Sequence, residues 1–374
     1  MEHNVVKLVN ATDRRRIVNS ICSCMPADNL KTLLTEDVPL FEFARRDGND
    51  PGIVREIVRL IKRVRPDIVH SHTWGTLCEA FLAARLARVP VLVHGEHGTM
   101  NLRPRNKIVQ RVLWKRVDRL LSVSSSLADT MSQYIGIDRS LIRVIYNGVK
   151  IERFMSGNPR IVRDELKLGE DEVLIVTVGR MEPVKDHATL LAAAGQLHRA
   201  GVTFRLVIVG EGTLRPELEG AVSREGLRGM VHFLGHRNDI EHVLAAADIF
   251  VLSSRSEGLP NGIMEAMAAG IAVVSTAVGG AAELVVNERT GLLVPAQSPD
   301  ALATALERLV RDGATRRMFG NAGRDRTLEK FTFARMVDQY EDLYLAAARE
   351  CSRLSGLFRD PDVAGIEREA KPSC

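Results

Sequence analysis

The stretch DIFVLSSRSEGLPNGIMEAMAAGIAVVSTAVGGAAE, residues 248–283, decides the fold of this chain. Residues 249–254 form a short apolar run with β-branched residues, which predicts a buried parallel strand. The next segment is rich in Met, Glu and Ala, and predicts a helix with Pro260 in its first turn and Gly270 at its end. A second apolar run follows at residues 271–276. A strand, a helix and a strand in this order predict a parallel α/β sheet.

Two carboxylates, Glu257 and Glu265, stand on either side of this strand-to-helix junction. The backbone amides of Asn261, Gly262 and Ile263 are expected to be free at the start of the helix and to face an anion. Glu257 lies at the mouth of that amide cluster and Glu265 about one turn into the helix, so both can point toward one polar ligand, such as a sugar joined to a ribose. The alternative is that the two glutamates belong to a solvated helix face.

Similar alternation of short apolar runs and helical stretches fills the rest of the chain. The further runs are residues 67–72, 91–97, 119–125, 173–180, 205–212 and 231–235. At 374 residues the chain is about twice the usual size of one domain. Asn147 and Gly148 predict a turn between two series of strands and helices. We therefore expect two doubly wound α/β domains facing a cleft, followed by a helix and a tail, with boundaries at residues 1–148, 149–332, 333–350 and 351–374.

The chain opens with helical spacing of apolar residues in MEHNVVKLVN and leads into an expected strand at residues 17–24. No strand is expected before that helix. In a doubly wound sheet the first strand is central, so its absence would leave buried backbone groups unpaired. We therefore expect the natural product to begin roughly 20–30 residues upstream.

Charge is distributed unevenly. Residues 1–150 contain 24 basic and 15 acidic residues, whereas the whole chain carries only +4. The expected helix RNKIVQRVLWKRVDRLL, residues 105–121, sets cations beside Ile108, Val112 and Trp114. This face could meet an anionic membrane surface, or it could be an ordinary amphipathic helix that covers a sheet. Nucleic acid is not an expected partner, because aromatic residues make up only 5% of the chain and no binding motif is present.

Cysteine usage and hydropathy indicate the compartment. The chain contains five scattered cysteines and no Cys-x-x-Cys pair, which argues against a disulfide framework or a zinc site. No apolar run approaches the length that spans a bilayer, and the first residues lack the order of a signal peptide. We expect a cytoplasmic protein that can attach peripherally to the inner face of the membrane.

The string Leu-Ser-Ser-x-x-Glu-Gly-x-Pro-x-x-x-x-Glu-Ala-x-Ala-x-Gly, followed by Val-Val-Ser-Thr-x-Val-Gly-Gly-x-x-Glu, closely resembles the retaining family 4 glycosyltransferases of the GT-B fold. The resemblance implies transfer of a hexosyl unit from a UDP- or GDP-sugar to a glycan or lipid-linked acceptor, in exopolysaccharide or cell-surface glycan synthesis. It also implies that the helix at residues 333–350 crosses back onto the first domain. In the family, a strand and a Gly-Gly loop precede the first helix.

Roles for individual residues follow from the resemblance. Glu265 would bind the ribose hydroxyls and Glu257 the donor sugar near its anomeric carbon. Gly-Arg-x-x-x-x-Lys, residues 179–185, matches the family segment in which Arg180 and Lys185 bind the diphosphate, although taken alone both could be solvated loop cations. With two cations and helix amides available, we expect no metal and no cofactor. Asp-x-Asp, the pattern needed for a metal, occurs usefully only at residues 360–362 of the tail.

The backbone at Gly258, Asn261 and Gly262 is also expected to contact the donor. The resemblance further implies a tight turn near the donor at Gly210, and a base contact from Arg237 in the loop that meets the base. Gly210 also invites a dinucleotide-binding interpretation, but the third glycine of that motif is absent.

In HGEHG, residues 94–98, the family places a histidine near the phosphate and the reacting sugar. His97 is our choice and His94 its competitor, while either could be structural. His70 and His72 are expected to support the floor of the cleft.

HGEHG, the first two residues of the chain and DGND at residues 47–50 resemble the sugar transferases of exosortase-linked exopolysaccharide systems. Lys150 departs from the family, in which an Asp often follows Asn-Gly-Val. Two alternatives stay open, a nucleotide-sugar epimerase and a truncated chain that binds nucleotide without catalysis.

Overall fold

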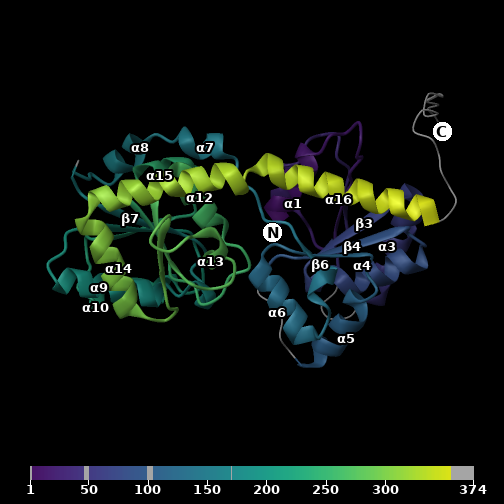
Figure 1. The fold of residues 1–374 in the computed structure, drawn as a ribbon, viewed down its shortest axis with the longest axis horizontal. Coiled ribbons are helices and arrows are strands. Elements are labelled where there is room, and N and C mark those ends of the chain that lie inside the picture. Colours follow the sequence, from purple (N-terminus) through teal and green to yellow (C-terminus); the bar gives the residue numbers. More distant parts are fainter. Residues whose placement is uncertain (1, 46–49, 99–103, 170, 355–374) are drawn as a thin grey trace.

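A computed structural model describes residues 2–45, 50–98, 104–169 and 171–354. Most of the DGND segment and the whole of the Asp-x-Asp pattern at 360–362 lie outside the described residues. The chain forms two parallel α/β domains that lie side by side (Figure 1).

The N-terminal domain contains the elements up to β6. These are α1 (Glu2–Ala11), β1 (Ile21–Ser23), α2 (Asp28–Lys31), β2 (Leu40–Glu42), α3 (Pro51–Val64), β3 (Ile68–His72), α4 (Trp74–Leu86), β4 (Val91–Glu96), α5 (Pro104–Trp114), β5 (Arg119–Ser122), α6 (Ser125–Ile135), η1 (Arg139–Leu141) and β6 (Ile142–Val144).

The C-terminal domain follows, and a last helix returns to the first domain. These elements are α7 (Ile151–Met155), α8 (Pro159–Glu165), β7 (Leu174–Val178), η2 (Pro183–Lys185), α9 (His187–Arg199), β8 (Arg205–Val209), α10 (Arg215–Arg224), β9 (Val231–Gly235), α11 (Ile240–Ala246), β10 (Ile249–Leu252), α12 (Asn261–Ala269), β11 (Ala272–Thr276), α13 (Ala281–Leu284), β12 (Gly291–Val294), α14 (Pro299–Arg311), α15 (Gly313–Lys330) and α16 (Phe333–Leu354).

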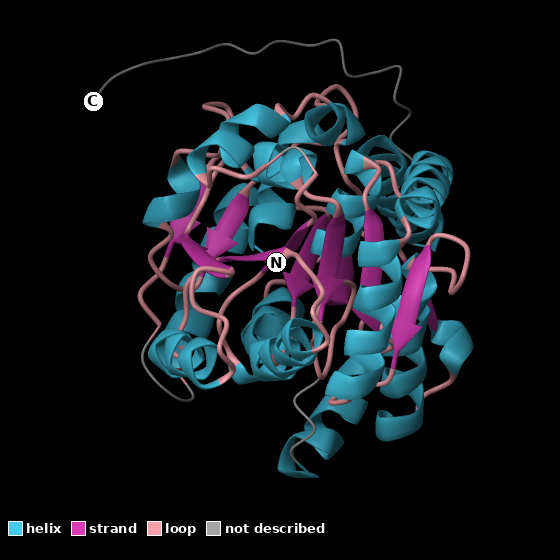
Figure 2. Cartoon of the chain, turned by 90° about the vertical axis from the view of Figure 1, so that its left-hand side faces the viewer, coloured by secondary structure: helices cyan, strands magenta, loops and turns pink. Residues whose placement is uncertain are grey.

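The C-terminal domain is built on one continuous parallel sheet in the order β12-β11-β10-β7-β8-β9, with helices covering both faces (Figure 2). The residues of β10 are at most 4% exposed, because helices cover both faces of this strand. The strand order reverses between β10 and β7, which is where doubly wound sheets bind ligands. The predicted strand, helix and strand of residues 248–283 are confirmed as β10, α12 and β11.

Helix α12 has the predicted end and a slightly different start. Gly270 caps it in the left-handed conformation with φ 78°, which glycine adopts without strain. Pro260 is the residue before the helix rather than part of its first turn.

The N-terminal domain is divided. β3, β4, β5 and β6 form a four-stranded parallel sheet, and β1 pairs only with β2. A cavity of about 640 Å³ lies between the β1-β2 pair and the four-stranded sheet. Its lining includes Ile21–Cys24 on one side, Val69–His72 on the other and Val5 of α1. The strand expected over residues 17–24 is limited to three residues, because among the described residues β1 has a partner on one edge only. The expectation of an upstream segment stays a prediction.

The helix expected over residues 105–121 is too long. Helix α5 ends at Trp114, and Arg119–Ser122 form β5 between β4 and β6. Leu120 and Leu121 are 4% and 2% exposed, so burial in a central strand prevails over the local helical pattern. No helix in the described part of the chain combines the length and apolar character needed to cross a lipid bilayer.

Two chain segments pass between the domains at one place. Val149 forms a parallel bridge with Thr332, and a side chain at Gly148 would stand 2.6 Å from the Thr332 carbonyl oxygen. Helix α16 then runs along the N-terminal domain (Figure 1). Its apolar residues, Tyr340 among them, pack with Val91, Val93 and Leu121 of β4 and β5 in one buried cluster.

Candidate functional site

Three of the predicted donor-site segments meet at the carboxyl edge of the C-terminal sheet. Glu257 follows β10, Lys185 follows β7 and Gly210 follows β8, and these three strands are adjacent. The Lys185 ammonium donates to Glu257 Oε1 at 2.6 Å, and the Ser254 hydroxyl donates to the same oxygen at 2.6 Å. The Glu257 side chain is only 12% exposed. A paired carboxylate is therefore fixed at the point where the strand order reverses.

Arg180 lies on the same edge but is exposed. Within the described ranges no hydrogen bond or ion pair of its guanidinium to another side chain is present. The structure therefore brings Lys185 and Glu257 together and leaves the Arg180 fork available to an anion.

Glycines allow close backbone approaches around this edge. A side chain at Gly210, where φ is +131°, would stand 2.1 Å from the Gly179 carbonyl oxygen, and one at Gly258 would stand 2.6 Å from the His97 carbonyl oxygen. Only a residue without Cβ fits such distances. The second approach crosses between domains and sets the loop of Glu257 directly against the loop of His97.

Glu265 lies in α12, partly buried. Burial raises its pKa, while the positive charges of Lys7 and Arg153 oppose that rise. Lys7 belongs to α1 of the other domain, and burial lowers its pKa while Glu265 raises it. The Glu265 carboxylate of the C-terminal domain therefore interacts electrostatically with the Lys7 ammonium of the N-terminal domain.

The start of α12 differs from the expected cluster of three free amides. The Ile263 amide donates to the Pro260 carbonyl at 3.2 Å, because the first turn closes with an i→i+3 hydrogen bond. The Asn261 side chain accepts a hydrogen bond from Asn147 in the linker at 3.0 Å. Gly262 packs closely on Phe250, since a Cβ there would stand 3.0 Å from the Phe250 ring.

Arg237 is committed to protein carboxylates in this structure. All three of its guanidinium nitrogens donate, to Asp239 at 2.9 and 2.7 Å and to Glu165 at 2.9 and 2.7 Å. The hydrogen bonds to Asp239, and then those to Glu165, hold its pKa above the ordinary value. Contact with a nucleotide base would require these pairs to open.

Four histidines gather at the carboxyl ends of β3 and β4. His97 and His72 share a hydrogen bond between Nε2 and Nδ1 at 2.9 Å. His94 is fully buried and uses both nitrogens, toward Ser71 and Glu96. Nδ1 of His70 lies 2.7 Å from the Tyr344 hydroxyl. The structure thus places His97, rather than His94, against the other domain.

Burial favours the neutral form of three of these histidines, His70, His72 and His97, because it lowers their pKa values. It lowers the pKa of His97 to about 4 and the pKa values of His70 and His72 well below the ordinary value. Nδ1 of His97 is buried and has no hydrogen-bond partner in the described residues. His97 can therefore offer or accept a hydrogen bond at Nδ1 without first losing a proton.

The described part of the chain shows no group of three or more His, Cys, Asp or Glu side chains arranged to hold a metal ion. Independence from metal stays a prediction, because the tail pattern lies outside that part.

Two contacts were missed from sequence. One joins His72 to His97, and nothing in the spacing pointed to it. The other joins Glu283 of α13 to the start of α6 in the other domain. The sequence did contain a signal for this second contact, because Glu283 is the last residue of the string that resembles family 4 glycosyltransferases.

Comparison with known proteins gives consistent results for both halves. Residues 160–326 match the family model for glycosyl transferases group 1, and residues 2–153 match the model for glycosyltransferase family 4. An Escherichia coli UDP-Gal:alpha-D-GlcNAc-diphosphoundecaprenol alpha-1,3-galactosyltransferase is 32% identical over 77% of this chain and 78% of its own. An alpha-maltose-1-phosphate synthase of Mycolicibacterium smegmatis is 31% identical over 74% and 78%.

Solved structures show the same architecture. A glycosyltransferase from Rickettsia africae superposes with a TM-score of 0.82 at 20% identity, covering 92% of this chain and 94% of its own. Anabaena HepE in complex with UDP and glucose superposes with a TM-score of 0.81 at 21% identity, covering 92% and 95%. These likenesses extend over both domains and confirm the predicted GT-B fold class of two Rossmann-like domains.

Proposed function

Because the chain belongs to the group 1, family 4 glycosyltransferases, we propose that it is a retaining, metal-independent hexosyltransferase that uses a UDP- or GDP-sugar. The observation that carries the proposal is the Glu257–Lys185 pair at the carboxyl edge of the C-terminal sheet, with the loop of His97 directly opposite. The UDP-Gal donor of the E. coli relative and the UDP bound to HepE favour UDP over GDP.

The pair suits a donor sugar attached to a diphosphate. Both hydrogen bonds to Glu257 fall on Oε1, so Oε2 can accept from sugar hydroxyls without displacing a partner in the described residues. Arg180 supplies a free fork and Lys185 a point charge to the departing diphosphate. Stabilising that charge lowers the barrier to breaking the glycosidic bond. Glu265 would hold the ribose one turn deeper.

We further propose a lipid-linked or glycan acceptor at an anionic membrane surface, in exopolysaccharide or other surface-glycan synthesis on the cytoplasmic side. Helix α5 supports this. Ile108, Val109 and Val112 are 73%, 44% and 43% exposed. Exposed cations including Lys107 and Arg111 flank them. Exposed apolar residues among cations are what a helix lying in a membrane interface presents.

The first experiment is a calorimetric titration of the chain with UDP and with GDP, paired with nucleotide release from UDP-sugars in the presence of a membrane lipid extract. Binding together with acceptor-dependent release is expected. Binding without release would instead support a nucleotide-binding chain without catalysis, and sugar conversion without an acceptor would support an epimerase.

The variant Glu265→Ala should weaken UDP binding about 10- to 100-fold, since it loses the ribose contact. Glu307 is a half-exposed glutamate paired with Arg311 in α14. Glu307→Gln is the matched control and should bind UDP normally. EDTA should leave release unchanged, and a loss restored by Mn²⁺ would overturn the metal-independent part of the proposal.

A further inference from the structure

Glu283 closes the family string but has no part in the proposed donor site. It lies in the short helix α13, and its carboxylate crosses to the N-terminal domain. Oε2 accepts from the Ser125 amide at 2.9 Å and Oε1 from the Ser126 amide at 2.7 Å. The Tyr146 hydroxyl donates to Oε2 at 2.8 Å. One carboxylate thus receives three hydrogen bonds from the other domain.

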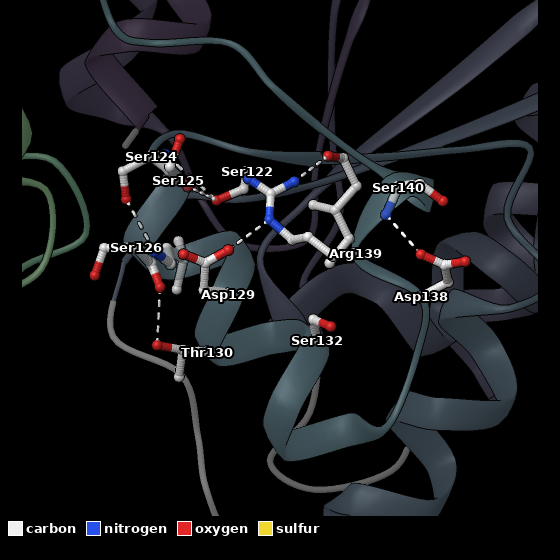
Figure 3. Close-up of polar contacts among 12 residues, drawn as sticks. Ser122, Ser124, Ser125, Ser126, Asp129, Thr130, Ser132, Asp138, Arg139 and Ser140 are labelled. Carbon is white, nitrogen blue, oxygen red and sulfur yellow. Dashed lines mark hydrogen bonds and ion pairs between the residues drawn. The ribbon is translucent and has the colours of Figure 1, made fainter.

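The receiving site is the start of α6, a helix of 11 residues. The helix's own cap, Ser124, satisfies the Leu127 amide at 3.2 Å, which leaves the first two amides for Glu283. Figure 3 shows these serines at the start of α6, with the green ribbon of the C-terminal domain at its left edge. A carboxylate is favoured there because the amides are unpaired within the helix and the helix dipole is positive at that end.

Glu283 is itself held firmly by its own domain. Arg326 of α15 donates to the Glu283 carbonyl at 2.8 Å and to the Leu284 carbonyl at 2.8 Å. The Arg326 guanidinium also lies over the Phe331 ring, 5.6 Å from its centroid. Phe331 in turn packs edge-on against Tyr146 at 5.6 Å. The contact therefore joins fixed elements of both domains.

The contact between α6 and α13 continues toward the loops of Glu257 and His97. The Ser124 hydroxyl donates to the Gly258 carbonyl at 2.9 Å, and Gly258 is the residue that lies against the His97 backbone. A Cβ at Gly280 would also stand 3.0 Å from Cβ of Ser124. Whatever fixes α6 against α13 therefore also fixes the loop of Glu257 against the loop of His97.

We propose that Glu283 is a positioning residue that locks the two domains in the arrangement that brings the loops of Glu257 and His97 together. The identity of the reacting groups rests on the proposed function, whereas the domain contact does not. Without the Glu283 carboxylate, the domains separate more readily. The donor still binds, because its contacts lie in the C-terminal domain, but transfer slows.

The test compares Glu283→Ala, Glu283→Gln and Tyr146→Phe with the wild type and with the control Glu307→Gln. Small-angle X-ray scattering measures the radius of gyration with and without UDP, calorimetry measures the Kd for UDP, and UDP release measures turnover. Glu283→Ala should have a larger radius without UDP, a Kd within about twofold of wild type, and a kcat about 10- to 100-fold lower. Glu283→Gln keeps one acceptor oxygen and should be intermediate.

Tyr146→Phe keeps both amide contacts and should lower kcat about 2- to 5-fold, which preserves the test if the alanine variant fails to fold. An unchanged radius and unchanged turnover in Glu283→Ala would overturn the proposal. So would a loss of UDP binding in a folded variant, because Glu283 would then serve the donor site. If the wild type itself releases no UDP, the proposed function fails, while the change in radius still tests the lock.

Discussion

The two domains share one architecture but differ in how completely it is built. The C-terminal domain has a continuous six-stranded sheet, whereas the N-terminal domain has four strands and a separate pair with a cavity between them. The dense sequence motifs all fall in the continuous sheet. Backbone approaches such as that of Gly210 tolerate no larger residue, so the geometry of this edge depends on an uninterrupted sheet. The divided domain carries looser patterns.

The largest expected effect separates the contributions of the two domains to chemistry. Glu257→Gln should lower kcat about 100- to 1,000-fold with little change in the Kd for UDP, because it removes the charge beside the reacting sugar. His97→Asn, on the other domain, should lower kcat less. Release assays and calorimetry measure both. Wild-type kcat in the two variants would place the reacting groups elsewhere.

The next effect tests the rigidity of the continuous sheet. Gly210→Ala should destabilise the chain by about 2–4 kcal/mol, since its Cβ meets a carbonyl in a left-handed conformation. Gly229, with φ +78° and open space around it, is the matched control, and Gly229→Ala should cost about 1 kcal/mol. Urea denaturation gives both values. Equal costs would mean that the close approach is not what fixes this edge.

Acid should destabilise the two domains to different extents. The pKa of His97 is about 4 when folded against about 6.5 in an unfolded chain, so the unfolded state binds more protons between these values. Stability is therefore lost as pH falls from about 6.5 toward 4. The pKa values of His70 and His72 are lowered as well, which gives three such histidines in the described N-terminal domain. The described C-terminal domain has two, His187 with a pKa of about 4 and His232 with a lowered pKa.

The N-terminal domain should accordingly unfold first on acidification. The two tryptophans of the chain, Trp74 and Trp114, both belong to that domain, so their fluorescence reports on it alone, while far-ultraviolet circular dichroism reports on both. The fluorescence transition is expected at the higher pH. Coincident transitions would contradict a difference in acid sensitivity.

The smallest effect concerns the outer surface. Ile108→Glu should weaken binding to phosphatidylglycerol vesicles about 5- to 20-fold, because it places a negative charge on the apolar face of α5. Ile161 is a matched exposed isoleucine in the other domain, 42% exposed, and Ile161→Glu should leave vesicle binding unchanged. If both variants bound vesicles equally well in co-sedimentation, α5 would not be the membrane-binding face.

The strand, helix and strand of residues 248–283 could be predicted because local signals and burial agree there. The apolar run of β10 is central in its sheet, and Gly270 ends α12 where the sequence requires it. The helix predicted through residue 121 was too long because Arg119–Ser122 gain more from pairing with β4 and β6 than from continuing a helix. The strand predicted at 17–24 shortened to three residues, with a partner on one edge only.

The site was predictable only in part, because only some of its contacts lie within one sheet. Residues that follow adjacent strands of one sheet, such as Glu257 and Lys185, converge by topology alone. Contacts between domains follow no local rule, because Glu283 and Ser126 are 157 positions apart. The engagement of Arg237 with Glu165 likewise depends on the packing of α8 beside α11.

The bridge between Val149 and Thr332 makes the C-terminal domain an insertion into the N-terminal domain, to which helix α16 returns. Its two ends are neighbours, so two cuts would release residues 150–331 as a cassette whose termini already meet. Domain insertions are tolerated where the two ends lie close together in this way. On the proposed division of donor and acceptor sites between the domains, a chimaera that receives the corresponding cassette of a relative should keep its own acceptor and adopt the relative's donor sugar, provided that Gly148 and its close approach to Phe333 are retained.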